Sequence, residues 1–154
     1  GHPEWIDFPR EGNGWSFHYC RRQWSLKDNG FLKYQWLNDF DHDMVHTCKK
    51  HKIFQQQMAN LMLMKAPEQT LCFARMDLFF VFNFHPSNSL QNVLVPVYSD
   101  SKEFVVEFTS DDKKYGGYNQ IAHQVYPVKE FNGQRFVELY IPARTAIVLR
   151  EIKE

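Results

Sequence analysis

The spacing of hydrophobic residues changes partway along this chain of 154 residues. Up to about residue 58, apolar side chains recur every three or four positions, which is the period of a helix that is packed on one side. From residue 60 onwards they alternate with polar residues or form short runs between turn residues, as strands do. The sequence therefore predicts a helical part, residues 1–59, followed by a β-rich domain, residues 60–154.

The helical part is expected to contain several short elements. Ser16 can cap a short helix that reaches Trp24. After the turn signal at residues 28–30, the periodicity predicts one bent helix or two helices that end at about residue 51. One more helical turn is expected at residues 53–58. Such a set of helices is too small to form a good core of its own.

The β-rich part contains eight short apolar or alternating runs between turn residues. The predicted strands are residues 61–65, 71–75, 78–84, 92–97, 104–109, 125–128, 136–141 and 146–150. The run at 78–84 is apolar at nearly every position, so we expect a central strand that is covered on both faces. Antiparallel strands at this spacing bury their apolar faces by closing one sheet on another, which predicts a mainly β fold with an antiparallel β-sandwich.

The amino-acid composition argues against some classes of binding partner. The chain has 18 Lys and Arg against 18 Asp and Glu, so it lacks the basic excess of many nucleic-acid-binding proteins and membrane-surface proteins. No apolar run is long enough to span a bilayer. Cys20, Cys48 and Cys72 form no metal-binding or disulfide pattern and suggest reduced thiols. We therefore expect a cytoplasmic protein with neither a nucleic acid nor a membrane as partner.

The first fifteen residues predict a structured loop with a binding function. Aromatic faces stack on the apolar faces of sugar rings, and polar side chains meet the hydroxyl groups. The candidate substrate-binding residues are Trp5, Asp7, Phe8, Arg10 and Asn13. In the structural alternative, the aromatic residues of this loop, including Trp15, pack one domain against another.

Several segments in the same order along the chain carry a resemblance. They are Gly-His-Pro-Glu-Trp-Ile-Asp-Phe-Pro-Arg-Glu-Gly-Asn at 1–13, Leu-Asn-Asp-Phe-Asp-His-Asp-Met at 37–44, Phe-Val-Phe-Asn-Phe-His-Pro-Ser at 80–87, Asp-Asp at 111–112, Tyr-Gly-Gly at 115–117 and Tyr-Ile-Pro-Ala-Arg-Thr-Ala at 140–146. Together they resemble the C-terminal portion of 1,4-α-glucan (glycogen or starch) branching enzymes of the α-amylase superfamily. The resemblance implies the last helices of an incomplete (β/α)8 barrel, followed by the C-terminal all-β domain.

The resemblance also sets expectations for activity. The parent enzyme would cleave an α-1,4 bond and transfer the chain to a 6-hydroxyl group, with no cofactor or metal. Its catalytic carboxylates would sit on earlier barrel strands, so no catalytic residue is assigned in this chain, and the chain alone should be inactive. The implied partners are the α-glucan polysaccharide and the missing N-terminal barrel.

The sequence also leaves other hypotheses to weigh against this one. A stand-alone carbohydrate-binding or interaction β-domain could bind glucan through Tyr98, Tyr115, Tyr118 or Tyr126, and a purely structural interaction domain would bind none. His42 and His46 have zinc-ligand spacing on a helix but lack an evident third ligand, which favours a solvated polar face. Residues 111–118 lack the pattern of a calcium or phosphate loop, which favours a turn with glycine at positive φ.

Overall fold

The structure is a computed structural model that describes residues 6–20, 24–55, 58–98 and 100–153. Its helices are η1 (Glu11–Asn13), η2 (Trp24–Asp28), α1 (Tyr34–Lys50), η3 (Ile53–Gln55) and η4 (Lys113–Tyr115), of which only α1 is an α-helix. Its strands are β1 (Asn60–Lys65), β2 (Thr70–Arg75), β3 (Leu78–Asn83), β4 (Leu90–Pro96), β5 (Glu103–Thr109), β6 (Val125–Phe131), β7 (Gln134–Ile141) and β8 (Thr145–Ile152). Every predicted strand is therefore present, with ends shifted by up to three residues.

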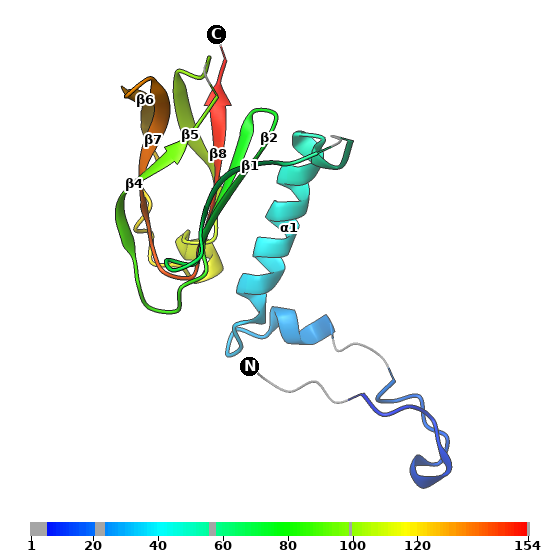
Figure 1. Ribbon diagram of the computed structural model, residues 1–154. Helices are drawn as coiled ribbons and strands as arrows, with labels where there is room; N and C mark the ends of the chain where they lie inside the picture. Colours follow the sequence, from blue (N-terminus) through cyan, green and yellow to red (C-terminus); the bar gives the residue numbers. More distant parts are fainter. Residues whose placement is uncertain (1–5, 21–23, 56–57, 99, 154) are drawn as a thin grey trace.

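The strands form an antiparallel β-sandwich, as the sequence predicts. Their order is β1-β2-β3-β8-β5-β6-β7-β4, and each neighbouring pair is antiparallel. Buried side chains from both halves of this order share one core, including Phe79 and Val81 of β3 with Val95 of β4 and Leu139 of β7. Figure 1 shows the two layers, with α1 alongside them.

Strand β6 takes part in both layers. Its first part pairs with β5, where Tyr126 lies opposite Phe104 and Pro127 lies opposite Glu103. Its second part pairs with β7 from Val128 onwards. Proline has no backbone N–H to donate, so it is suited to the position where a strand leaves one ladder and joins another. The sandwich is thus one continuous set of strands that folds over at Pro127.

Helix α1 covers the outer face of the layer that contains β3, β8 and β5. The Phe40 ring of α1 lies 5.1 Å from the Phe108 ring and 5.4 Å from the Tyr115 ring, measured between centroids. Leu78 and Val148 are buried beneath this contact. Strand β3 is therefore covered on both faces, which confirms its prediction as a central strand.

The helical predictions are correct only in part. Of the two alternatives, one bent helix or two helices, the structure has one helix, α1, which begins at Tyr34 and ends at Lys50, and the extra turn after it is η3. The helix predicted from Ser16 is wrong for residues 16–20, which form turns, while residues 21–23 lie outside the described ranges. Ser16 Oγ accepts a bond from the N–H of His18, only two residues on, and thus closes a turn. A short helix also needs tertiary packing, and Phe17 is largely exposed.

Candidate functional site

The opening loop brings several predicted binding residues together. Arg10 donates from Nε to Asp7 Oδ1 over 3.0 Å and from Nη2 to Asp7 Oδ2 over 3.3 Å. Asn13 Nδ2 donates to Asp7 Oδ2 over 3.1 Å. The Asp7 carboxylate is thus held by a bidentate guanidinium and an amide, which fixes its orientation within the loop.

Asn13 organises the backbone of the loop. Its Oδ1 accepts the N–H of Arg10 at 2.9 Å and that of Ser16 at 3.3 Å, and its Nδ2 also donates to the Phe8 carbonyl at 3.0 Å. The Asp7 N–H donates to the Tyr19 carbonyl at 3.1 Å and closes the loop at its base. The polar side chains therefore build the loop largely through bonds to one another.

The aromatic side chains of the loop face solvent. Phe8 is 70% exposed and Trp15 is 66% exposed. Figure 1 shows that residues 6–20 project away from the sandwich, beyond the N-terminal end of α1. Trp5, the remaining predicted binding residue, lies outside the described residues. The loop thus presents open aromatic surface next to a fixed carboxylate and guanidinium.

The charges of the loop suit binding better than proton transfer. The hydrogen bond from Arg10, followed by that from Asn13, lowers the pKa of Asp7, and Asp7 in turn raises the pKa of Arg10. A carboxylate with a lowered pKa stays ionised near neutral pH and is a poor general acid. Asp7 can accept hydrogen bonds from ligand hydroxyl groups, and Arg10 can donate to them.

Replacing Asn13 with alanine should loosen the loop without unfolding the protein. The N–H groups of Arg10 and Ser16 lose their acceptor, so we expect their hydrogen exchange to accelerate about tenfold. The melting temperature should change by less than about 1 °C because the loop lies outside the core. Amide exchange measured by NMR tests this, with Asn29→Ala as the matched control. Unchanged protection of both amides would contradict the role given to Asn13.

The α1 helix is joined to the sandwich by two polar clusters. Asp43 accepts bonds from Tyr115 Oη at 2.6 Å and Lys114 Nζ at 2.9 Å. The bond from Tyr115, with those from His42 and Lys114, lowers the pKa of Asp43. These contacts place the η4 turn directly against α1.

Glu107 of β5 forms the second cluster, at the C-terminal end of α1. It accepts bonds from His51 Nε2 at 2.9 Å, from Arg150 Nε at 2.8 Å and from Lys50 Nζ. Burial raises the pKa of Glu107, but the bonds from His51, Lys50 and Arg150 outweigh burial and lower it to about 2. Glu107 is therefore an ionised acceptor that ties the helix end to β5 and β8.

The η4 turn has the form that the sequence predicts. Together with the loop after it, it lines a hollow that the sequence did not predict. Gly116 has φ +79°, which confirms the turn with glycine at positive φ. Asp111 accepts the backbone N–H groups of Tyr118, Gln120 and Ile121. This loop, the β3–β4 loop and the β7–β8 turn together line a hollow of about 490 Å³. Arg144, which also lines it, was not assigned to a site, because nothing in the sequence shows that three distant turns meet.

The two helical histidines form a solvated pair. Their ring centroids lie 4.1 Å apart, His42 Nδ1 contacts Asp43 at 3.0 Å, and His46 Nδ1 contacts the His42 carbonyl at 2.9 Å. Across the residues that the structure covers, no three His, Cys, Asp or Glu side chains gather in a way that could hold a metal ion. Nor does any helix in those ranges have the length and apolar character to cross a bilayer.

Comparison with known proteins supports the resemblance. Residues 63–151 match a family described as "Alpha amylase, C-terminal all-beta domain". Over 96% of its length, the chain is 40% identical to a 1,4-alpha-glucan-branching enzyme of Yarrowia lipolytica. Over 97% of its length, it is 39% identical to that of Saccharomyces cerevisiae and 35% identical to that of Rhizophagus irregularis.

The matched region is a small part of these relatives. The chain spans 22% of the length of each of the three enzymes. The family match covers β2 to β8 almost completely, together with the end of β1. Before the matched domain, the first sixty residues of the chain are also similar to 1,4-α-glucan-branching enzymes. The chain therefore belongs to the family of the α-amylase C-terminal all-β domain.

Proposed function

We propose that this chain is the C-terminal part of a 1,4-α-glucan-branching enzyme, which cleaves α-1,4 linkages and forms α-1,6 linkages in glycogen or starch. The observation that carries the proposal is identity near 40% over almost the whole chain to enzymes of that name. Retaining glycosyl transfer needs two carboxyl groups about 5 Å apart on a rigid framework. We assign no catalytic residue to this chain, and we expect the chain alone to be inactive.

The two parts of the chain would have different roles in the enzyme. Residues 1–59 would complete the catalytic barrel, and residues 60–154 would form the C-terminal domain that stabilises it. Trp5, Asp7, Phe8, Arg10 and Asn13 would contact the glucan from the opening loop. The exposed aromatic rings and the fixed Asp7–Arg10 pair support this role, since they combine stacking surface with hydroxyl-binding groups.

The missing N-terminal barrel would cover the apolar surface that the helical part leaves open. Phe31 is 100% exposed, and Trp24, Leu37, Met44 and Val45 are also exposed to solvent. Several large apolar side chains exposed on one short stretch of chain are consistent with an interface. The Yarrowia lipolytica relative, of which this chain matches 22%, supports a partner that lies in the same polypeptide.

We also propose a cytoplasmic location. Cys20, Cys48 and Cys72 are all free thiols, and burial raises the pKa of Cys72 to about 12. Unpaired thiols are usual in proteins of reducing compartments. The substrate, glycogen or starch, would be met there without a cofactor.

A chimeric enzyme tests the proposal. The segment of the Yarrowia lipolytica enzyme that matches this chain is replaced by residues 1–154, and branching is measured as new α-1,6 linkages in amylose. We expect activity in the chimera, because the chain would restore the missing wall of the site and the supporting sandwich. We expect none from the 154-residue chain alone or from the relative truncated before this segment.

Two outcomes would overturn the proposal. A folded chimera without branching activity would show that this chain cannot serve the enzyme. Branching by the chain alone, in preparations free of other glucan-active enzymes, would show that the catalytic groups lie within it. Chimera folding is checked by its melting temperature against that of the intact relative.

A further inference from the structure

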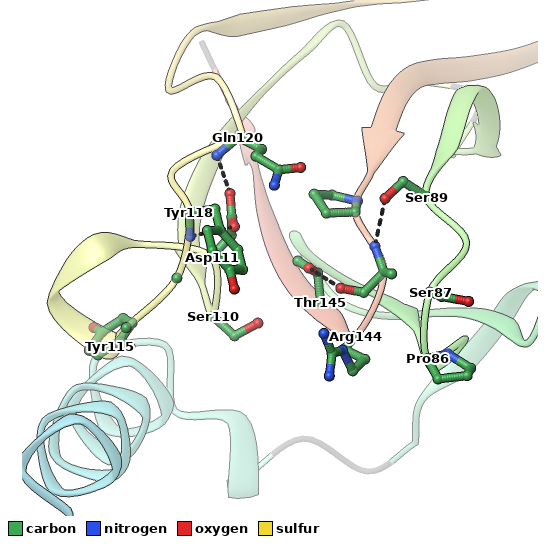
Figure 2. A pocket seen from close by; sticks show the side chains of 14 residues that line it. Pro86, Ser87, Ser89, Ser110, Asp111, Tyr115, Tyr118, Gln120, Arg144 and Thr145 are labelled. Carbon is green, nitrogen blue, oxygen red and sulfur yellow. Dashed lines mark hydrogen bonds between the residues drawn. The ribbon is translucent and has the colours of Figure 1, made fainter. Parts of the chain in front are cut away.

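The hollow at one end of the sandwich is built from three separate turns. Its volume is about 490 Å³, within the range of roughly 300–1,000 Å³ that is usual for small-molecule sites. In Figure 2, Tyr118 and Gln120 lie on one side, Ser87 and Ser89 on the opposite side, and Arg144 between them. Side chains from three turns far apart in sequence thus converge on one space.

The walls of the hollow are held in place by the backbone. The Asp111 carboxylate accepts the N–H of Tyr118 at 3.1 Å and that of Ile121 at 2.9 Å, besides that of Gln120. The Ala143 N–H donates to Ser89 Oγ at 3.1 Å, which joins the two other turns. A site whose walls are fixed before binding loses little conformational entropy when a ligand enters.

The groups that remain for a ligand are mostly neutral. Ser89 Oγ accepts the Ala143 N–H and keeps its O–H for donation, while Gln120 Oε1 accepts the Tyr140 hydroxyl at 3.0 Å and leaves the amide NH₂ available. The charged residues of the lining are Asp111, whose carboxylate faces backbone N–H groups, and Arg144. One cation among hydroxyl and amide groups suits a neutral polyhydroxyl ligand better than a polyanion.

An open aromatic ring completes the hollow. Tyr118 is 76% exposed although its backbone is fixed by Asp111. An exposed ring on a fixed backbone at the edge of a polar hollow can stack on the apolar face of a pyranose while the hydroxyl groups of the sugar meet the polar walls. We propose that this hollow is a second glucan-binding site, separate from the opening loop, which holds a short stretch of α-1,4-linked glucose. The identity of the sugar rests on the proposed function.

Site-resolved titration tests the inference. The ¹⁵N-labelled 154-residue chain is titrated with maltoheptaose, and the amide shifts of Ser89, Gln120 and Arg144 are followed. We expect these amides to shift together. Tyr118→Ala should weaken binding at these amides about tenfold through lost stacking, whereas Tyr118→Phe, which keeps the ring, should stay within about twofold.

A control variant and a second site variant complete the test. Phe131→Ala is the matched control and should not change the titration. Phe131 is 67% exposed and ends β6 at the β6–β7 turn, whereas the hollow is lined by the turn at the opposite end of β7. Arg144→Asn removes the guanidinium but suits the positive φ of 54° at this position, and it should weaken binding about fivefold. The amide spectra of all variants without sugar report whether the fold is kept.

The outcomes separate this inference from the proposed function. Absence of shifts at the three amides with millimolar maltoheptaose, or an unchanged titration in Tyr118→Ala, overturns the second site even if the chimera is active. Shifts at the hollow with an inactive chimera support the second site and count against the enzyme. Tighter binding of glucose 1-phosphate than of maltoheptaose at the same amides would also overturn the proposal, because it would identify an anion site.

Discussion

Replacing Gly117 with alanine is expected to lower the free energy of unfolding by about 3 kcal/mol, at the upper end of the usual cost of overpacking. A Cβ atom at this position would lie 2.1 Å from the Asp111 carbonyl oxygen and 2.2 Å from its carbonyl carbon. Both atoms belong to the backbone, so a side-chain rotation cannot relieve the overlap. The same oxygen accepts the Asn119 N–H at 2.8 Å, so moving it would also weaken that bond.

Urea unfolding followed by circular dichroism measures the effect of Gly117→Ala. Gly30→Ala is the matched control, because a Cβ atom there meets nothing within 4 Å. We expect the control to change the free energy of unfolding by less than about 0.5 kcal/mol. A loss below about 1 kcal/mol in Gly117→Ala would contradict the close approach of the two backbone segments.

Replacing Glu107 with glutamine should destabilise the protein at neutral pH and have little effect in acid. A pKa of about 2 in the folded state, against an ordinary 4.5, corresponds to about 3 kcal/mol of stability. Because the folded-state pKa is the lower one, this contribution is fully present above about pH 5. It is lost as the pH falls from 4.5 towards 2, where the folded protein also takes up the proton.

Urea unfolding at pH 7, 4 and 2.5 tests this expectation. The difference between wild type and Glu107→Gln should shrink from about 2–3 kcal/mol at pH 7 to a small remainder at pH 2.5. Taking the difference removes the contributions of Asp7 and Asp43, which both proteins share. Glu138→Gln is the control, because Glu138 forms an exposed pair with Lys129 and should cost less than about 1 kcal/mol. A difference between wild type and Glu107→Gln that is independent of pH would show that Glu107 acts through packing alone.

Much of the sandwich could be predicted because the pattern of apolar residues along a strand shows which of its faces are buried. The run from Leu78 to Phe82 is apolar on both faces, and in the structure Phe79 faces the sandwich core while Phe80 packs toward the α1 side. The helices were less predictable. Helix formation depends on a surface to pack against, and residues 16–20 have little such surface in this chain.

Of the two candidate sites, the sequence could indicate the opening loop but not the hollow. Asp7, Arg10 and Asn13 lie within seven residues, so a local loop could bring them together and the sequence could indicate it. Ser89, Gln120 and Arg144 come from turns separated by more than twenty residues each. Their meeting depends on the order of the strands, which local patterns do not contain.

The sequence by itself determined the strands, most of whose ends lie within one residue of the predicted ones, the helical character of residues 34–50, and the glycine-dependent turn at Gly116, because each depends on neighbours along the chain. Tertiary structure decided that β6 changes layers at Pro127, that Glu107 ties the end of α1 to the sandwich, and that three turns enclose a polar hollow. These features depend on contacts between residues far apart in sequence, and such contacts exist only once the sheets have closed on each other.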